Sequence, residues 1–359
     1  MKRVFISDCE GPISKNDNAF EVASQFIPNG NRLFSVISRY DDVLAEVLKR
    51  PSYKAGYTLK LILPFLKAYD LTDQKMQEFS ANSLVLISNV KDMLQHVRSI
   101  AHAFVVSTSY EHYIRALCQA LDFPFRNTYC TKVSIDKHYI TKQERNRLKE
   151  LAAEIAQMQM ITIPPNVKSM EEFSHDDQRT IHRLDEIFWE KIANMESGRA
   201  YSEVNPMGGG EKAEAIEDVV RKLKVSLADA MYVGDSITDK EAFRLVRENR
   251  GLAVSFNGNQ YAVSSAEIAV LSETSISTAI IADIFCRFGK KQALELAENW
   301  QKGKLNKSQV NRSLLERFFK FNNNKSRVKI VTSRNVEKLA RESNEFRRKV
   351  RGEAIGRLG

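Results

Sequence analysis

The stretch Val4-Phe5-Ile6-Ser7-Asp8-Cys9-Glu10-Gly11-Pro12 decides the fold of this chain. An apolar run that ends in an acid predicts a short buried β-strand with Asp8 at its carboxyl end. Side chains alternate along an extended chain, so Asp8 and Glu10 point the same way before Gly11 turns the backbone. Ligands of open α/β sheets bind at the carboxyl ends of the strands. The two acids are therefore the first candidates for a functional site.

Apolar runs of the same kind recur along the chain, with helical patterns between them. The predicted strands are Arg3–Ser7, Ala103–Ser107, Ala230–Gly234 and Leu252–Phe256, with a weaker fifth at Ile268–Leu271. This alternation predicts an α/β fold with a Rossmann-like, doubly wound parallel sheet and right-handed crossovers. A further strand at Val328–Val331 is only weakly indicated.

Two gaps between the predicted strands are much longer than a βαβ unit needs. The first contains apolar residues at helical spacing and predicts a helical cap. In the second, Thr141-Lys142-Gln143-Glu144 is a capping-box pattern that opens a helix, and a second amphipathic helix follows Pro164-Pro165. The expected units are an α/β core (1–12, 81–132 and 200–284), a helical cap (13–80), a helical hairpin (133–199) and a helical C-terminal extension (285–359).

Composition and charge limit the class of protein. The 359 residues are 43% hydrophobic and 28% charged, which is ordinary for a globular protein. No apolar run is long enough to span a membrane, and the start of the chain does not resemble a signal peptide, so we expect a cytoplasmic protein. The four cysteines show no CxxC spacing and are expected to be reduced, with Cys9 in the core.

The net charge of +9 is concentrated in the tail. From residue 285 onward there are 20 Lys/Arg against 7 Asp/Glu (+13), which leaves 34 against 38 (−4) for residues 1–284. The cluster Arg347-Arg348-Lys349-Val350-Arg351 is dense, but no nucleic-acid-binding motif accompanies it. A solvated or partner-docking helix is the favoured interpretation, and nucleic-acid binding stays the alternative.

Four segments carry groups suited to phosphoryl chemistry. The first carries Asp8 and Glu10, the second Ser107 and Thr108, the third Lys212 after three glycines, and the fourth Asp235 and Asp239 in Gly234-Asp235-Ser236-Ile237-Thr238-Asp239. A phosphoryl group needs cations and hydrogen-bond donors around its oxygens. Mg²⁺ between two carboxylates would allow a carboxylate nucleophile to approach that group. Asp8 and Asp235 are the natural pair of ligands.

This ordered set resembles the haloacid dehalogenase superfamily of phosphohydrolases over about residues 1–280. The resemblance implies that Asp8 is the nucleophile and that Glu10 is the general acid/base, with its backbone carbonyl on Mg²⁺. It also implies that Ser107 and Lys212 hold the phosphate and that Asp235 is a ligand of the metal ion, with Asp239 either a further ligand or a residue that supports the ligands.

Two narrower resemblances point further. Gly210–Ile216 and Gly251–Asn257 look most like the phosphoserine-phosphatase branch. Asp-Cys-Glu-Gly-Pro also resembles archaeal proteins labelled as a subunit associated with energy-converting hydrogenase A.

Several assignments have alternatives. Thr108 or Ser109 could take the place of Ser107, because strand ends are uncertain by a residue or two. The glycines before Lys212 do not form a P-loop, because the spacing and the following Ser/Thr are missing. Within the cap, Arg39, Lys54 and Tyr57 either face a substrate phosphate or form an ordinary solvated surface.

Glu10 is the residue on which activity depends. Glu10 is one methylene longer than the Asp expected there. Two outcomes are consistent with this difference: an active phosphatase with adjusted geometry, or a slow enzyme whose aspartyl-phosphate persists.

The expected function is a Mg²⁺-dependent phosphatase that acts on a small phosphorylated metabolite through Asp8. The alternative is a catalytically weak regulatory or interaction subunit that retains metal and phosphate binding. The sequence specifies neither the substrate nor the oligomeric state.

Overall fold

A seven-stranded sheet forms the centre of the protein. The computed structural model describes the chain except residues 1, 166, 306–307, 322–325, 357 and 359. The strand order is β3-β2-β1-β4-β5-β6-β7, and all pairs are parallel except β6 with β7. The strands are β1 (Val4–Ser7), β2 (His102–Tyr110), β3 (Thr128–Thr131), β4 (Ala230–Gly234), β5 (Leu252–Phe256), β6 (Ile268–Leu271) and β7 (Arg327–Ile330). The predicted doubly wound parallel sheet is confirmed, and the antiparallel edge strand β7 is a departure from the prediction.

The five predicted strands are all present, and two edge strands complete the sheet. β2 continues to Tyr110, three residues beyond the predicted end at Ser107. β3 has the sequence TYCT, too short and too polar to stand out as an apolar run. The weakly indicated strand near Val328 is real and pairs antiparallel with β6.

Helices cover both faces of the sheet because side chains alternate along each buried strand. Phe5 faces one hydrophobic cluster, whereas Val4 and Ile6 face another. The first face is covered by α6 (Val90–Ile100), α7 (Glu111–Leu121), α14 (Ile276–Phe288), α15 (Lys290–Glu298) and α17 (Arg312–Phe321), with the short α16 (Lys302–Leu305) between the last two. The second face is covered by α11 (Gly209–Leu223), α12 (Lys240–Glu248) and α13 (Gln260–Ser265).

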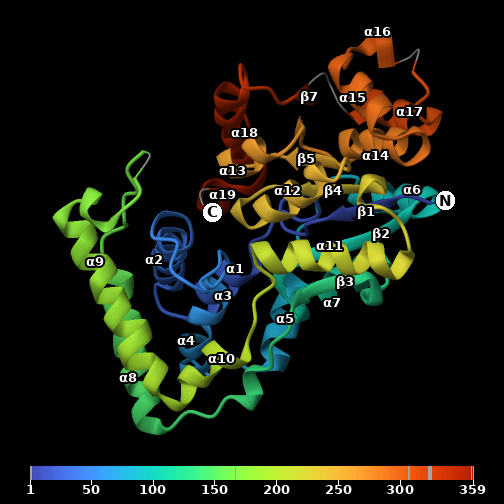
Figure 1. The fold of residues 1–359 in the computed structure, drawn as a ribbon. Coiled ribbons are helices and arrows are strands. Elements are labelled where there is room, and N and C mark those ends of the chain that lie inside the picture. Colours follow the sequence, from blue (N-terminus) through green and yellow to red (C-terminus); the bar gives the residue numbers. More distant parts are fainter. Residues whose placement is uncertain (1, 166, 306–307, 322–325, 357, 359) are drawn as a thin grey trace.

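The two long insertions share one hydrophobic core (Figure 1). The first contributes α1 (Asn18–Phe26), α2 (Gly30–Asp42), the π-helical turn η1 (Val43–Val47), α3 (Thr58–Leu61), α4 (Leu63–Ala68) and α5 (Asp73–Ser83). The second contributes α8 (Lys142–Gln157), α9 (His175–Asp185), the π-helical turn η5 (Glu186–Lys191) and α10 (Ala200–Glu203). The predicted capping box at Thr141 and Glu144 opens α8. We call these helices together the cap; the exact domain boundaries stay a prediction.

The C-terminal helix α18 (Val336–Arg351) is anchored to the core. Leu339 and Ala340 pack in a cluster with residues of α13 and β6, and Ser343 Oγ donates to the carbonyl of Gly258 at 2.7 Å. The short α19 (Glu353–Gly356) follows and lies between core and cap, on the side of α2 (Figure 1). The basic segment is therefore part of the folded body.

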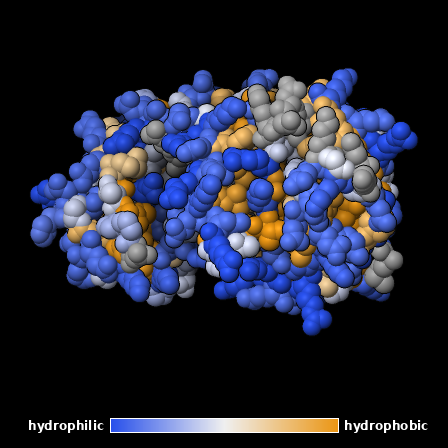
Figure 2. Space-filling view, turned by 90° about the horizontal axis from the view of Figure 1, so that it is seen from above, coloured by the Kyte–Doolittle hydropathy of each residue, from blue (hydrophilic) through white to orange (hydrophobic). Residues whose placement is uncertain are grey.

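The exterior carries mainly polar side chains. The face in Figure 2 is mostly hydrophilic, with apolar side chains gathered in a few patches. None of the described helices combines the length and the apolar composition that crossing a lipid bilayer would need.

The shared core of the cap makes a stability prediction. Phe188 of the second insertion is fully buried, stacks on Tyr40 and meets Phe65 edge-on, and both partners belong to the first insertion. We expect Phe188→Ala to lower the free energy of unfolding by about 3–5 kcal/mol, measured by urea denaturation. The exposed Tyr139→Ala is the control and should stay within about 0.5 kcal/mol of the parent protein. A loss as small as that of the control would show that the insertions do not share a core.

Candidate active site

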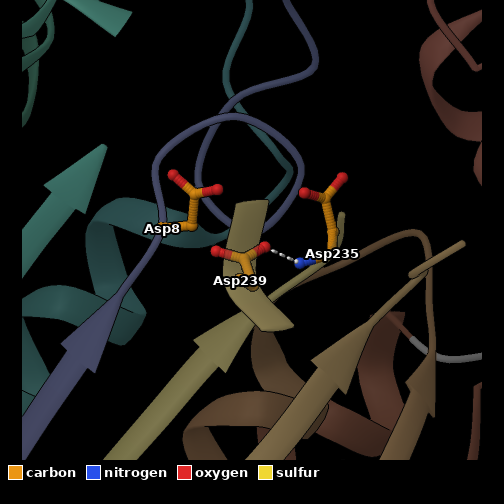
Figure 3. A group of neighbouring side chains, drawn as sticks. All are labelled: Asp8, Asp235 and Asp239. Carbon is orange, nitrogen blue, oxygen red and sulfur yellow. Dashed lines mark hydrogen bonds between the residues drawn. The ribbon is translucent and has the colours of Figure 1, made fainter. Parts of the chain in front are cut away.

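The carboxyl ends of β1 and β4 bring three carboxylates together. β1 pairs with β4, and the backbone N–H of Asp8 donates to the carbonyl of Val233 at 2.8 Å. Asp8 and Asp235 therefore leave neighbouring strands side by side, with Asp239 below them (Figure 3). One carboxylate oxygen from each of the three lies within 4.8 Å of the others, and all three residues are buried.

Lys212 is the cation that holds this cluster together. Its side chain is fully buried, and Nζ lies 2.7 Å from Asp8 Oδ2 and 2.7 Å from Asp239 Oδ1. A third bond, to Thr238 Oγ1, is 3.1 Å long. Burial alone would lower the pKa of Lys212, but the two carboxylates outweigh it and raise that pKa. The ammonium is thus a fixed positive charge beside Asp8.

Asp239 is surrounded by donors. Oδ1 accepts from Lys212 and from the Tyr232 hydroxyl at 2.6 Å. Oδ2 accepts from the backbone N–H groups of Asp235 and Ser236 at 2.8 and 2.9 Å. These bonds, with Lys212, outweigh burial and lower the pKa of Asp239. Asp239 therefore fixes Lys212 and the start of the loop that carries Asp235.

The pKa of Asp8 shifts the other way from that of Asp239, because burial outweighs the nearby cation. Burial raises its pKa to about 7; Lys212 opposes the shift, and Asp239 and Asp235 add to it. Its Oδ1 accepts from the backbone N–H of Cys9 at 2.6 Å. Cys9 itself is fully buried, as expected for a core thiol.

Gly11 allows the first loop to pass close to Asp235. Its φ of +100° lies in the region that favours glycine, and a Cβ on Gly11 would collide with the Asp235 carboxylate. The turn after the two acids therefore requires glycine for both conformation and space.

Glu10 lies at the N-terminus of α1. Its Oε1 accepts from the backbone N–H of Asn18, the first residue of that helix, at 2.8 Å. Burial raises the pKa of Glu10 well above its usual range, and nearby Asp17 adds to the shift, although Arg351 and the Asn18 N–H oppose it. The protonated form that a general acid needs is thereby favoured.

The hydroxyl groups that face the cavity belong to Thr108 and Ser109, and not to Ser107, which was the first candidate. Thr108 and Ser109 line the cavity beside Asp8, whereas Ser107 Oγ accepts from the Ser109 N–H at 3.2 Å. Among the described residues Ser109 Oγ is buried without a hydrogen-bond partner. The extra length of β2 thus brings the alternative hydroxyls, Thr108 and Ser109, to the cavity wall.

Two arginines of α18 enter the site, which the sequence analysis did not anticipate. Arg347 Nη1 and Arg351 Nη1 both donate to Asp235 Oδ2, the second at 3.0 Å. Arg347 and Arg351 are only 3% and 9% exposed, whereas Lys349, which lies between them in the sequence, is exposed. The spacing of four residues puts both on one face of the helix, but only the tertiary fold places that face over Asp235. For these two residues the prediction of a solvated helix was wrong, because both are buried against the core; docking on a partner stays a prediction for the rest of the helix.

The cap closes over these groups and leaves a cavity of about 100 Å³. Its walls come from the core, the cap and the C-terminal segment: Asp8, Glu10, Asp17, Ala19, Phe34, Ser38, Asp41, Asp42, Gly56, Thr58, Leu59, Thr108, Ser109, Asp235, Ser236, Ile237, Thr238, Arg347, Arg351 and Leu358. The cap candidates Arg39, Lys54 and Tyr57 are outside this set. Lys54 instead pairs with Glu211 of α11, and this ion pair ties the cap to the core.

The donor set suits a hard divalent cation. Carboxylate oxygens are the ligands that Mg²⁺ prefers, and Asp8 and Asp235 point their carboxylates into the same space (Figure 3). Asp239 is a less available ligand, because each of its oxygens already accepts at least two hydrogen bonds, whereas each oxygen of Asp8 accepts one. The residues present therefore fit Mg²⁺ between Asp8 and Asp235.

Residues 71–280, more than half of the chain, match the family model of the haloacid dehalogenase-like hydrolases. The chain belongs to this family. Asp8 precedes the matched segment, whereas Lys212, Asp235 and Asp239 lie within it.

Solved structures provide a second comparison for this hydrolase. A gene product of Archaeoglobus fulgidus is 25% identical, with a TM-score of 0.81, and the match covers 100% of this chain and 99% of that one. An apo phosphoserine phosphatase is 12% identical with a TM-score of 0.42, over 76% of this chain and 96% of that one. A substrate-bound phosphoserine phosphatase is 11% identical with a TM-score of 0.43, over 76% and 95%. No curated protein matches the chain.

The buried carboxylate of Asp42 predicts a dependence of stability on pH. Burial raises its pKa to about 7; Arg39 at 3.5 Å opposes the shift, and Asp41 and Glu46 add to it. A folded-state pKa above the unfolded value gives stability that is complete at low pH and lost as pH rises through 7. Relative to Asp42→Asn, we expect the parent protein to lose about 2 kcal/mol of unfolding free energy between pH 5 and pH 8.

Urea denaturation of both proteins at several pH values measures this loss. Asp176→Asn, at an exposed position on α9, is the control and should follow the parent protein at every pH. Parallel curves for Asp42→Asn and the parent protein would contradict the prediction.

Proposed function

We propose that this hydrolase is a Mg²⁺-dependent phosphatase that hydrolyses a small phosphorylated metabolite through an aspartyl-phosphate on Asp8. The observation that carries the proposal is the buried contact of Asp8 with Lys212, 2.7 Å long, on the floor of a cavity that Asp235 also faces. A carboxylate there is accessible to a phosphoryl group, and a fixed cation next to it offsets the repulsion between the two anions.

In this mechanism Asp8 Oδ1 or Oδ2 attacks phosphorus, and the bond to the leaving oxygen breaks. Glu10 gives its proton to the leaving oxygen and then takes a proton from the water that hydrolyses the acyl-phosphate. Lys212, in contact with Asp8, and the hydroxyls of Thr108 and Ser109 on the cavity wall bind phosphoryl oxygens, and Ser107 supports the end of β2 through the Ser109 N–H. Asp239 positions Lys212 rather than contacting the substrate.

Mg²⁺ would be held by Asp8, Asp235 and the backbone carbonyl of Glu10, and when bound it supplies positive charge that offsets the charge of the phosphoryl oxygens. The small volume of the cavity favours a small substrate.

A second candidate function is supported by the contacts of Asp235. Arg347 and Arg351 both occupy one of its oxygens, so a chain that never releases this carboxylate would bind a metal ion poorly. Such a protein would be the catalytically weak regulatory or interaction subunit. Turnover decides between the two.

Replacement of the nucleophile tests the proposal. We expect the parent protein with Mg²⁺ to release phosphate from p-nitrophenyl phosphate or from a panel of small phosphomonoesters. Asp8→Asn should lower kcat/KM by at least about 10³-fold, since no carboxylate remains to attack. Lys329→Gln, on the edge strand β7, is the matched control and should retain full activity. Equal phosphate release by the parent protein and Asp8→Asn would refute the mechanism and favour the second candidate.

Glu10 provides a separate test of the second half-reaction. Glu10→Gln keeps the size of the side chain and removes the proton-transfer group, so turnover should fall by about 10²–10⁴-fold. Because water is then no longer activated, a phosphorylated protein should accumulate and appear in intact-protein mass spectra. Glu10→Asp should recover part of the turnover. Unchanged turnover in Glu10→Gln would exclude Glu10 as the acid/base.

A further inference from the structure

The helix α18 closes one wall of the active site, and its two inward arginines are built into the fold. Arg351 Nε donates to the carbonyl of Lys15 at 3.0 Å, and its Nη2 donates to the carbonyl of Asn16. Arg347 Nη1 also donates to the backbone carbonyl of Asp235 at 3.1 Å. The Ser343 contact with Gly258 fixes the preceding turn of the helix. These guanidinium groups therefore have defined positions in the cavity.

The chain does not give every donor of these guanidinium groups an acceptor of its own. Two guanidinium groups share the single oxygen Asp235 Oδ2. In addition, Arg347 Nε is buried and donates to no acceptor among the described residues. A buried donor without a partner costs free energy unless a ligand supplies the acceptor. The cavity that these arginines line, together with Ser109 Oγ, thus contains unused donors suited to an anion.

The formal charges of the contacting side chains also favour an anionic ligand once a divalent cation is bound. Asp8, Asp235 and Asp239 carry three negative charges, and Lys212, Arg347 and Arg351 carry three positive ones in direct contact with them. A divalent cation on Asp8 and Asp235 adds two positive charges, and a phosphomonoester dianion adds two negative ones. Counted over these six side chains and the two ligands alone, the charges then sum to zero, and without the two arginines they would sum to −2; the acids Glu10, Asp17, Asp41 and Asp42 line the same cavity.

We propose that Arg347 and Arg351 are substrate-binding residues: with Mg²⁺ on Asp235, their guanidinium groups bind the oxygens of the phosphoryl dianion. This inference rests on the proposed function. Arginine suits the role, since its donors match phosphate oxygens in pairs and its charge is permanent. The C-terminal helix thereby becomes a third wall of the substrate site, beside core and cap.

Inorganic phosphate is the probe, and isothermal titration calorimetry in saturating Mg²⁺ gives its Kd without turnover. Arg347→Gln and Arg351→Gln should each weaken phosphate binding by at least about tenfold. Arg341→Gln replaces an exposed arginine of the same helix and should bind phosphate like the parent protein. Arg347→Lys and Arg351→Lys keep a cation next to Asp235, so they should fold even where the Gln variants do not, and should lose about three- to tenfold.

A parallel titration with Mg²⁺ alone distinguishes the proposal from the alternative that the two arginines merely block the binding of Mg²⁺ to Asp235. If the arginines only compete with the metal ion, the Gln variants would bind Mg²⁺ more tightly and bind phosphate as well as the parent protein, which would overturn the proposal. Absence of phosphate binding to the Mg²⁺-loaded parent protein would also overturn it.

Failure of the proposed function has a different signature. In that case no phosphomonoester is hydrolysed, although phosphate binding and its dependence on Arg347 and Arg351 are still measured. Conversely, normal hydrolysis with unaltered phosphate binding in all the arginine variants would support the proposed phosphatase activity and refute this inference alone.

Discussion

The contact of Lys212 with Asp8 and Asp239 is the interaction on which the rest of the site depends. It joins the end of β1, the first turn of α11 and the loop after β4, which meet at one edge of the sheet. Burying three charged groups is expensive, and their mutual attraction offsets that cost only because hydrogen bonds satisfy the remaining oxygens. The Tyr232 hydroxyl and two backbone N–H groups supply those bonds to Asp239. The arrangement is therefore specific for lysine at this position.

Around this fixed centre, the remaining parts of the site differ in how permanently their charges are paired. Both carboxylate oxygens of Asp239 accept hydrogen bonds from lysine, tyrosine and backbone donors. Among the described residues, the side chains that bind the Asp235 carboxylate are Arg347 and Arg351, and a metal ion would have to share or displace them. Permanent pairing suits a residue that positions others, and exchangeable pairing suits a residue that binds ligands. The contacts of the two aspartates therefore favour Asp235 as the metal ligand and Asp239 as its support; the sequence left open whether Asp239 is a ligand or a supporting residue.

Much of the fold and of the acidic floor of the candidate site could be predicted because both depend on local patterns. Five strands follow from apolar runs, and the positions of Asp8 and Asp235 follow from the strand ends. The contributions of β3 and Arg347 could not be predicted, and the choice of Ser109 over Ser107 stayed open, each for a physical reason. β3 is a short polar edge strand, Ser109 reaches the cavity because β2 continues past Ser107, and Arg347 is buried only through the docking of α18 on α13.

The bonds from Arg351 to Lys15 and Asn16 join residues 336 and 335 positions apart along the chain. Contacts so distant in sequence form late, and during synthesis the N-terminal strand waits for nearly the whole polypeptide to emerge from the ribosome. The wall that α18 provides is therefore the last part of the site to be added. A nascent or C-terminally shortened chain would present its acidic catalytic floor open to solvent.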